Sequence, residues 1–165
     1  DVVITMLPNS PQVKEVILGE NGVARYMKSG TCFIDMSSIN PVDSRYIGKI
    51  LKEKEIEMLD APVSGGEPKA IDGTVAFMVG GDENTFEKYK EILFKMGSSV
   101  TRCGELGAGN TTKLANQIIV AGNIQAVSEA FILAKKAGVN LECVFEAIKG
   151  GLAGSTVMNL SLIHI

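Results

Sequence analysis

Short apolar runs alternate with amphipathic stretches along the first 105 residues of the chain. Apolar runs bounded by polar or glycine-rich turns predict five strands, at 2–7, 31–35, 56–59, 74–79 and 99–103. Apolar positions at helical spacing predict helices that begin near Ser10, Pro41 and Asp82, with Ser10 and Asp82 as N-caps. This β-α-β-α order predicts an α/β fold with a mostly parallel, doubly wound sheet.

The pattern changes after Gly109. The segment 110–137 has no proline, a single glycine at Gly122 and no turn cluster, which predicts one long helix. Apolar residues surround this helix on several sides, so we expect it to be buried as a spine between domains or subunits. A shorter helix is predicted from Leu141 onward. The boundary between an α/β part and an all-α part therefore falls near residue 105.

The composition is that of a globular domain. Hydrophobic residues make up 45% and charged residues 21% of the 165 residues, and the formal net charge is −3. The chain has no basic stripe of the kind that a phosphate backbone requires, so we expect no nucleic-acid partner. It also has no uninterrupted apolar run of roughly 18 residues, and we expect no membrane partner.

The histidine and cysteine content narrows the chemistry. The only histidine, His164, is the penultimate residue, which argues against a Ser-His-Asp or Cys-His triad and against a multi-histidine metal site. Cys32, Cys103 and Cys143 lie far apart without C-x-x-C spacing, and we expect buried thiols in a reducing cytoplasm rather than disulfides or a zinc site. Acid–base chemistry must then use Lys, Asp, Glu, Tyr or Cys, and we expect no metal.

A first candidate site is Asp-Ala-Pro-Val-Ser-Gly-Gly at 60–66, directly after a predicted strand. Open parallel sheets bind ligands beyond the carboxyl ends of their strands, which is where this segment falls. Paired glycines let the backbone approach a ligand closely, and consecutive N–H groups can hold an anion. The same residues also fit a purely structural tight turn that requires positive φ.

A second candidate occupies 104–117. Its glycines are spaced G-x-x-G-x-G, the reverse of the dinucleotide fingerprint, and it lacks the required βαβ context, so we do not interpret it as a phosphate loop. Lys113, Asn116 and Gln117 stand at i, i+3 and i+4 and share one face of the predicted helix. A lysine can act as a general acid or base when burial lowers its pKa. The alternative is a solvated first turn whose lysine reaches into water.

Two further strand-to-loop transitions, at 6–10 and 35–38, carry polar residues. We expect both loops to lie along the same edge of the sheet. Turn chemistry alone explains each of them.

These motifs, in this order, resemble the β-hydroxyacid dehydrogenase family, which includes 3-hydroxyisobutyrate dehydrogenase and 6-phosphogluconate dehydrogenase. The resemblance runs from residue 1 to about Val157 and rests on Met-Leu-Pro at 6–8, Asp-Met-Ser-Ser at 35–38, the 60–66 segment, and Gly-x-Gly-x-x-x-Lys-x-x-Asn at 107–116. It implies the C-terminal part of a Rossmann-like dinucleotide-binding domain in 1–105 and the start of an all-α domain in 106–157.

The resemblance also implies roles for the matched residues. Lys113 matches the family's catalytic lysine, which protonates the carbonyl oxygen as hydride arrives and takes the proton back in the reverse direction. Ser64, Gly65 and Gly66 match the loop that binds the substrate carboxylate.

Further matched residues contact the substrate through a side-chain amide or contact the cofactor. An amide that orients the substrate falls at Asn116 or Gln117, because relatives differ between these two positions. The cofactor implied is NAD or NADP, and its nicotinamide and ribose are contacted by residues matching Leu7, Pro8, Gln12 and Ser38.

Parts of the family pattern lie beyond this sequence. The Gly-rich phosphate loop, its strand and the acidic ribose partner fall upstream of Asp1, and most of the helical domain falls downstream. We therefore expect the chain to be an internal fragment that is inactive and binds no dinucleotide tightly on its own. The ending at 158–165 no longer follows the family, and we expect it to be non-native.

Two local motifs narrow the expected substrate. The stretches 65–73 and 150–156 resemble members that reduce 2-hydroxy-3-oxopropionate (tartronate semialdehyde) to glycerate. Oxidation of 3-hydroxyisobutyrate is the alternative, and a catalytically silent scaffold is an alternative of another class, against which the presence of Lys113 argues. The resemblance further implies a small substrate that bears a carboxylate, a homo-oligomer at full length and a cytoplasmic location.

Overall fold

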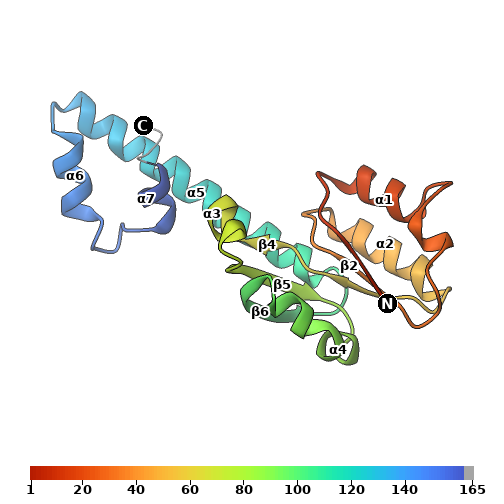
Figure 1. The fold of residues 1–165 in the computed structure, drawn as a ribbon. Helices are drawn as coiled ribbons and strands as arrows, with labels where there is room; N and C mark the ends of the chain where they lie inside the picture. The colour runs from red at the N-terminus through yellow and green to blue at the C-terminus, as the bar shows by residue number, and fades with distance from the viewer. Residues whose placement is uncertain (162–165) are drawn as a thin grey trace. The chain divides into compact units, whose positions relative to one another are not determined.

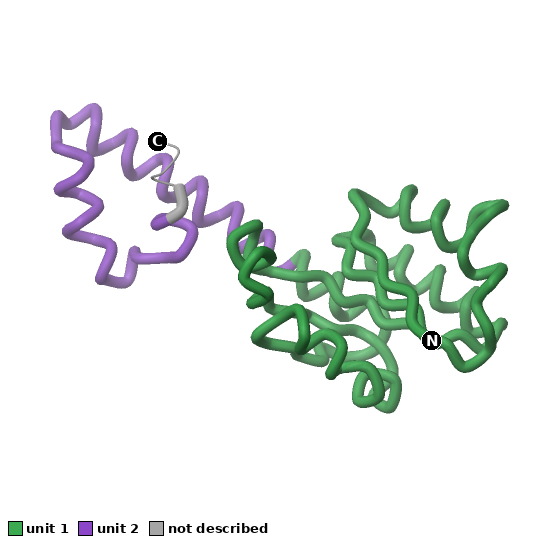
Figure 2. The backbone as a smooth tube through the Cα atoms, viewed as in Figure 1, with its two compact units in different colours: residues 1–114 green, residues 115–165 purple. Residues whose placement is uncertain are grey.

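A computed structural model describes residues 1–161 of the chain (Figure 1). The structure divides into two compact units, Asp1–Leu114 and the segment from Ala115 onward (Figure 2). The division falls inside one long helix, α5 (Ala108–Lys136). Every strand among residues 1–161 belongs to the first unit.

The first unit is a six-stranded sheet with helices. The strands are β1 (Val2–Thr5), β2 (Cys32–Asp35), β3 (Glu57–Asp60), β4 (Val63–Ser64), β5 (Val75–Gly80) and β6 (Gly97–Gly104). The helices before α5 are α1 (Ser10–Leu18), α2 (Pro41–Lys52), α3 (Gly66–Ile71) and α4 (Glu83–Phe94), and a 3-10 turn spans Val23–Arg25. The five predicted strands and three predicted helices are confirmed, whereas β4, α3 and the 3-10 turn were not predicted.

Alternate residues of the central strands enter two separate cores. Ile34 and Leu59 pack on one face with residues of α4, including Leu93. Phe33 and Met58 pack on the other face with residues of α1 and α2. Burying a side chain such as Phe33 or Leu59 contributes roughly 1.5–3 kcal/mol to stability. Because helices cover both faces, the doubly wound prediction is confirmed.

The sheet is mixed rather than uniformly parallel. β1, β2 and β3 are parallel, and β6 is parallel to β5. β5 instead runs antiparallel to β3 and β4. A parallel return needs a crossover of roughly a dozen residues or more, usually a helix that packs on the sheet. Here β4 continues beside the returning strand and only the six-residue α3 lies at the turn, so the chain reverses as a hairpin.

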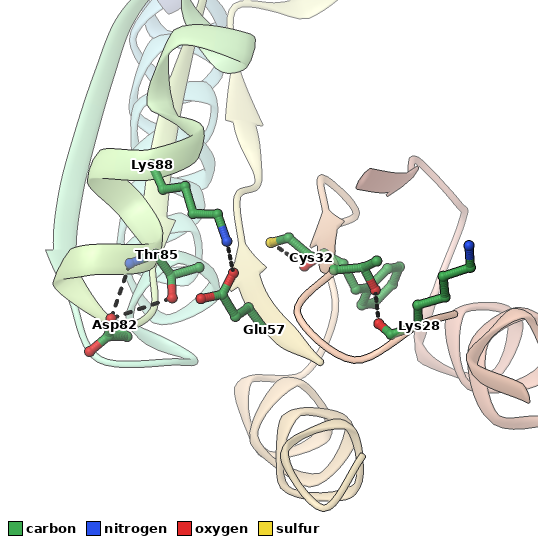
Figure 3. Close-up of polar contacts among 8 residues, drawn as sticks. Lys28, Cys32, Glu57, Asp82, Thr85 and Lys88 are labelled. Atoms are coloured by element: carbon green, nitrogen blue, oxygen red, sulfur yellow. Dashed lines mark hydrogen bonds and ion pairs between the residues drawn. The ribbon is translucent and has the colours of Figure 1, made fainter. Parts of the chain in front are cut away.

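Side-chain caps define where three helices begin. Asn9 and Asn40 accept hydrogen bonds at the starts of α1 and α2. Asp82 Oδ1 accepts from the backbone N of Thr85 at 3.0 Å, which confirms the predicted cap of α4 (Figure 3). The cap of α1 is Asn9 rather than the predicted Ser10, whose hydroxyl instead accepts from the backbone N of Asn40 at 3.2 Å.

The 29-residue helix α5 confirms the predicted long helix but is far less buried than expected. Among the described residues, Val127 and Phe131 are the only large apolar side chains of α5 that are buried. The exposed ones are Leu114, Ile118, Ile119, Ile124, Ile132 and Leu133. A helix that is apolar on several sides needs partners on several sides, and the two short helices after it cover a single stripe.

By length and composition α5 also meets the requirement for crossing a membrane, a test that long helices of soluble proteins pass as well. Its apolar sequence is interrupted by the amides of Asn116, Gln117, Asn123 and Gln125. Polar side chains of this kind are unfavourable where they face lipid.

The second unit has a small core of its own. Val127 and Phe131 pack with Met158 from α7 (Thr156–Ser161) and with half-buried residues of α6 (Leu141–Ile148). The helix predicted from Leu141 is thereby confirmed. In the segment predicted to be non-native, Met158 is only 1% exposed, while residues 162–165, including His164, lie outside the described residues.

Candidate active site

The carboxyl ends of β1, β2 and β3 form one edge of the sheet. Thr5, Asp35 and Asp60, the last residues of these strands, are register neighbours. The loops that leave the strands therefore start side by side, which confirms the predicted common edge for 6–10 and 35–38. Ligands of open parallel sheets bind beyond such an edge.

Buried polar groups tie the first two loops together. Ser37 Oγ accepts from the backbone N of Leu7 at 2.8 Å, and the backbone N of Ser37 donates to Asp35 Oδ1 at 3.1 Å. Thr5 Oγ1 donates to the same carboxylate oxygen at 2.9 Å. The position of Leu7 is therefore set by the end of β2 and not only by its own strand.

The residues predicted to contact a nicotinamide lie around these loops. Leu7 is half-buried, whereas Pro8, Gln12 and Ser38 are exposed. Gln12 is the third residue of α1. Ser37 thus holds the backbone of Leu7, while the exposed Pro8, Gln12 and Ser38 are accessible to a ligand.

One carboxylate oxygen of Asp35, at the end of β2, accepts no hydrogen bond within the described part of the chain. This oxygen is Oδ2, and the residue is wholly buried. Burial raises the pKa of Asp35, and the hydrogen bonds from Ser37 and Thr5 oppose that rise. A buried acceptor without a donor is unfavourable, so a donor group or water that reached Oδ2 would be stabilised.

The predicted carboxylate loop stands further out than the sequence suggested. β4 continues the line of β3, because Asp60, Val63 and Ser64 pair in one antiparallel register with Gly80, Phe77 and Ala76. Ser64 therefore lies about four strand residues, or roughly 13 Å, beyond the last residue of β3. The structure thus places the turn beyond the edge and not at it.

The two glycines after Ser64 adopt the backbone geometry that favours glycine. Gly65 has φ 143° and Gly66 has φ 68°, which confirms the expected positive φ. Both glycines are exposed, and Ser64 is half-buried. Their N–H groups precede and begin α3, so a tight turn and an exposed anion-binding backbone occur together here.

Lys113 is half-buried near the start of α5. Burial lowers the pKa of its ammonium group. No carboxylate lies within ion-pair distance of it in the described part of the chain. A lysine of this kind gives up its proton more readily than a solvated one, which suits proton transfer.

The two predicted amides follow on the same helix. Lys113 belongs to the first unit, whereas Asn116 and Gln117 belong to the second. Asn116 is half-buried, and its Nδ2 donates to Oε1 of the exposed Gln117 at 3.0 Å. Either amide keeps hydrogen-bonding groups for a ligand, and the choice between them stays open as predicted.

Sequence patterns missed how the start of α5 is held. The wholly buried carboxylate of Asp60 accepts from the backbone N of Gly107 and from the backbone N of Asn110, each at 2.7 Å. Asn110 is itself 1% exposed, and its Oδ1 accepts from the backbone N of Ile39 at 2.9 Å. A charged residue at the end of a buried strand was the available signal, since burying it requires partners.

The buried carboxyl of Asp60 makes stability depend on pH. Burial raises the pKa of Asp60 from 3.8 to about 6, against the lowering effect of its hydrogen bonds with Asn110 and Gly107. Between these pH values the folded chain keeps a proton that the unfolded chain has lost. We expect stability from this group to be highest below about pH 4 and to fall by about 3 kcal/mol as the pH rises to about 6.

Urea unfolding of wild type and Asp60→Asn at about pH 4 and about pH 7 measures this contribution. The substituted chain lacks the titrating group. Between the lower and the higher pH, the unfolding free energy of wild type is therefore expected to fall by about 3 kcal/mol relative to that of Asp60→Asn. Equal pH dependence in the two proteins would contradict the assignment. Exposed carboxylates such as Asp82 contribute equally to both proteins and cancel in the comparison.

Figure 3 shows polar contacts at the amino ends of β2 and β3. Glu57 begins β3 and pairs with Lys88 of α4 at 3.0 Å. Cys32 begins β2, and burial raises the pKa of its thiol to about 12, so it is no nucleophile. The expectation of buried thiols is confirmed for Cys32 but is wrong for Cys143, which is exposed, while Cys103 is intermediate.

Comparison with known families matches nearly the whole chain. Residues 1–104 match the family described as the NAD binding domain of 6-phosphogluconate dehydrogenase. Residues 107–164 match the family described as NAD-binding of NADP-dependent 3-hydroxyisobutyrate dehydrogenase.

Similar proteins agree with these matches. The chain is 45% identical to 2-hydroxy-3-oxopropionate reductase of Escherichia coli over 160 residues, covering 97% of the chain and 55% of the relative. It is 42% identical to the probable mitochondrial 3-hydroxyisobutyrate dehydrogenase of Dictyostelium discoideum, covering 85% of the chain and 44% of the relative. The chain thus spans about half the length of the curated relatives it matches.

A solved structure gives the same answer for the fold. The 3-hydroxyisobutyrate dehydrogenase of Mycobacterium tuberculosis, determined with L-serine, superposes with a TM-score of 0.86 at 36% identity and covers 94% of this chain and 53% of that one. The chain belongs to the 3-hydroxyisobutyrate dehydrogenase-like family of NAD(P)-dependent β-hydroxyacid dehydrogenases.

Proposed function

We propose that the protein containing this chain reduces 2-hydroxy-3-oxopropionate to glycerate with NADH or NADPH, using Lys113 as general acid and, in the reverse direction, general base. The observation that carries the proposal is the half-buried Lys113, whose pKa is lowered by burial alone. The identity of 45% to the E. coli reductase supports the choice of substrate.

Each proposed role follows from the chemistry of the side chain. Lys113 donates a proton to the carbonyl oxygen as it becomes an alkoxide, and its lowered pKa reduces the cost of that transfer. The exposed backbone N–H groups at Gly65 and Gly66, with the Ser64 hydroxyl, hold the substrate carboxylate. The amide of Asn116 or Gln117 orients the substrate by hydrogen bonding.

The residues at the strand edge fit a bound nicotinamide. Leu7 and Pro8 offer an apolar surface, and Ser38 and Gln12 offer polar groups beside it. When bound, NADH or NADPH supplies the hydride, which no side chain can supply. The polypeptide contributes binding, orientation and the proton.

The domain organisation and assembly are part of the same proposal. We assign 1–105 to a dinucleotide-binding domain and 106–157 to a helical domain led by α5. The apolar side chains that α5 exposes require a cover from the rest of the protein or from a second copy, and we propose a homo-oligomer at full length. A cytoplasmic location is part of the same proposal.

The second candidate is oxidation of 3-hydroxyisobutyrate, favoured by the 42% and 36% identities to dehydrogenases of that name. Glycerate, the product of the first reaction, differs from 3-hydroxyisobutyrate at one carbon, where glycerate carries a hydroxyl and 3-hydroxyisobutyrate carries a methyl group. A site that hydrogen-bonds the hydroxyl discriminates strongly against the methyl analogue, because its polar group is left without a partner.

Steady-state assays of the complete gene product with both substrates test the proposal. Measured in the same direction, kcat/KM for glycerate oxidation is expected to exceed that for 3-hydroxyisobutyrate oxidation by roughly 10,000-fold or more, the discrimination that a site built to hydrogen-bond a hydroxyl reaches against an analogue without it. A higher kcat/KM for 3-hydroxyisobutyrate would favour the second candidate. Turnover of neither substrate, with purified folded protein and either dinucleotide, would contradict both.

A further inference from the structure

Asp60 lies where the two halves of the proposed site meet. It is the last residue of β3, and Ser64 follows four residues later in the register that β3 and β4 share. Its carboxylate also binds the backbone N–H groups of Gly107 and Asn110. Lys113 follows Asn110 by less than one helical turn. One side chain therefore connects the strand that leads to Ser64 with the helix that carries Lys113.

Close packing leaves the start of α5 little freedom. A Cβ at Gly80 would overlap Asp60 Oδ1 and would stand 2.7 Å from the backbone N of Gly109. On the other side, Asn110 Oδ1 accepts from the backbone N of Ile39, and Asn110 Nδ2 donates to Ser44 Oγ of α2 at 3.2 Å. The first turn of α5 is thus held by β3, by β5 and by α2.

The hydrogen bonds of Asp60 join a carboxylate to backbone N–H groups at the start of a helix. The first backbone N–H groups of a helix have no partner within the helix and require one from elsewhere. A carboxylate that accepts them gains from charge-assisted hydrogen bonding and from the positive end of the helix dipole. Exclusion from water makes both effects larger than at an exposed cap. A displaced first turn would carry Lys113 with it, because a helix is stiff over that length.

We propose that Asp60 is a positioning residue of the active site, whose buried carboxylate fixes the start of α5 and so sets where the Lys113 ammonium stands relative to the Ser64 loop. The proposal rests on the proposed function of Lys113 and Ser64. Asp60 itself touches no reacting group in this assignment.

Ionisable groups on each surrounding element define what a titration of Asp60 reports. They are Asp35 on β2, Arg45 on α2, Arg102 on β6, Glu105 directly after β6, and Lys113 on α5. Arg45 lies beside the cap, since its Nη1 would stand 2.6 Å from a Cβ at Gly107. The carboxylate of Asp35 instead accepts hydrogen bonds from Thr5 and Ser37.

The first test compares wild type with Asp60→Asn by NMR on this chain. The amide NH₂ cannot accept a hydrogen bond, so one of the two backbone donors loses its acceptor. We expect hydrogen exchange at Gly107 and Asn110 to accelerate by roughly tenfold or more, and the ε-CH₂ resonance of Lys113 to titrate at a higher pH than in wild type. An unchanged Lys113 titration in a folded variant overturns the proposal.

Asp82→Ala is the matched control. It removes a carboxylate cap from α4 without touching α5. We expect unchanged exchange at Gly107 and Asn110 and an unchanged Lys113 titration. If this control shifts the Lys113 titration as much as Asp60→Asn does, general loosening explains the effect and the proposal fails.

Wild type alone provides a measurement that needs no folded variant. The backbone N–H resonances of Gly107 and Asn110 and the Lys113 ε-CH₂ resonance should move together as the Asp60 carboxyl titrates. Absence of any Lys113 response over that titration overturns the proposal.

Kinetics on the complete gene product separate this proposal from the proposed function. We expect Asp60→Asn to lower kcat by roughly 10- to 100-fold with KM for the dinucleotide unchanged. An unchanged kcat, with accelerated exchange at Gly107, makes the cap structural only and overturns the positioning role. An inactive wild type counts against the proposed function, and the Lys113 titration then decides the positioning role by itself.

Discussion

Replacing Lys113 with methionine is expected to lower kcat of the complete gene product by roughly 100- to 10,000-fold, the range associated with general acid–base catalysis. Methionine keeps an unbranched side chain of similar length but carries no proton. The half-buried site accepts an apolar side chain without a desolvation penalty, so the fold should be retained. Steady-state kinetics with saturating substrate and dinucleotide measure the loss.

Lys135→Met controls for the removal of a lysine from the same helix. Lys135 lies in the last turn of α5, far along the sequence from the proposed site, and it is exposed. Its substitution should leave kcat within a factor of about two, as expected for a surface change that removes no specific contact. A Lys113→Met protein that keeps more than a tenth of wild-type kcat would exclude Lys113 as the proton donor.

The sequence predicted the sheet well because its signal is local. Apolar runs such as 31–35 are explained by burial on both faces, and β2 indeed places Phe33 in one core and Ile34 in the other. The same reasoning failed to predict that β5 returns antiparallel. That direction depends on β4, a two-residue strand whose pairing with β5 becomes visible only when the chain is folded.

The prediction for α5 shows a different limit. Its apolar composition predicted burial, yet Ile118 is 74% exposed. Composition reports the surface that a helix must cover, and it does not say whether the covering residues belong to the same 165 residues. Within the described residues, Val127 and Phe131 of α5 are buried against α6 and α7.

Some residues of the candidate site could be predicted from the sequence and others could not. Lys113, Ser64 and Ser38 were reached through motif resemblance, and the structure adds their burial and surroundings. Asp60 was quoted within a motif but was given no role, because its partners Gly107 and Asn110 are 47 and 50 residues away in the sequence. Contacts of this separation leave no periodicity in a single sequence, so only the folded chain reveals them.

Gly109→Ala is the second substitution for which we expect a large effect, a loss of roughly 1–3 kcal/mol or more in unfolding free energy. A Cβ at this position would overlap the backbone oxygen of Met78 and would stand 2.5 Å from the backbone oxygen of Asp60. Both atoms belong to strands, so neither can rotate away as a side chain would. The start of α5 must then move off β3 and β5, which breaks the Asp60 cap as well.

Gly122→Ala supplies the matched control on the same helix. A Cβ at Gly122 would meet nothing within 4 Å, and alanine favours a helix interior by about 1 kcal/mol over glycine. Urea unfolding should therefore show Gly122→Ala as neutral or stabilised and Gly109→Ala as strongly destabilised, although the chemical change is identical. Equal stability of the two variants would show that the first turn of α5 is not held against the sheet. Because Lys113 follows Gly109 by four residues, the displaced helix should also lower kcat, which ties the stability of this junction to catalysis.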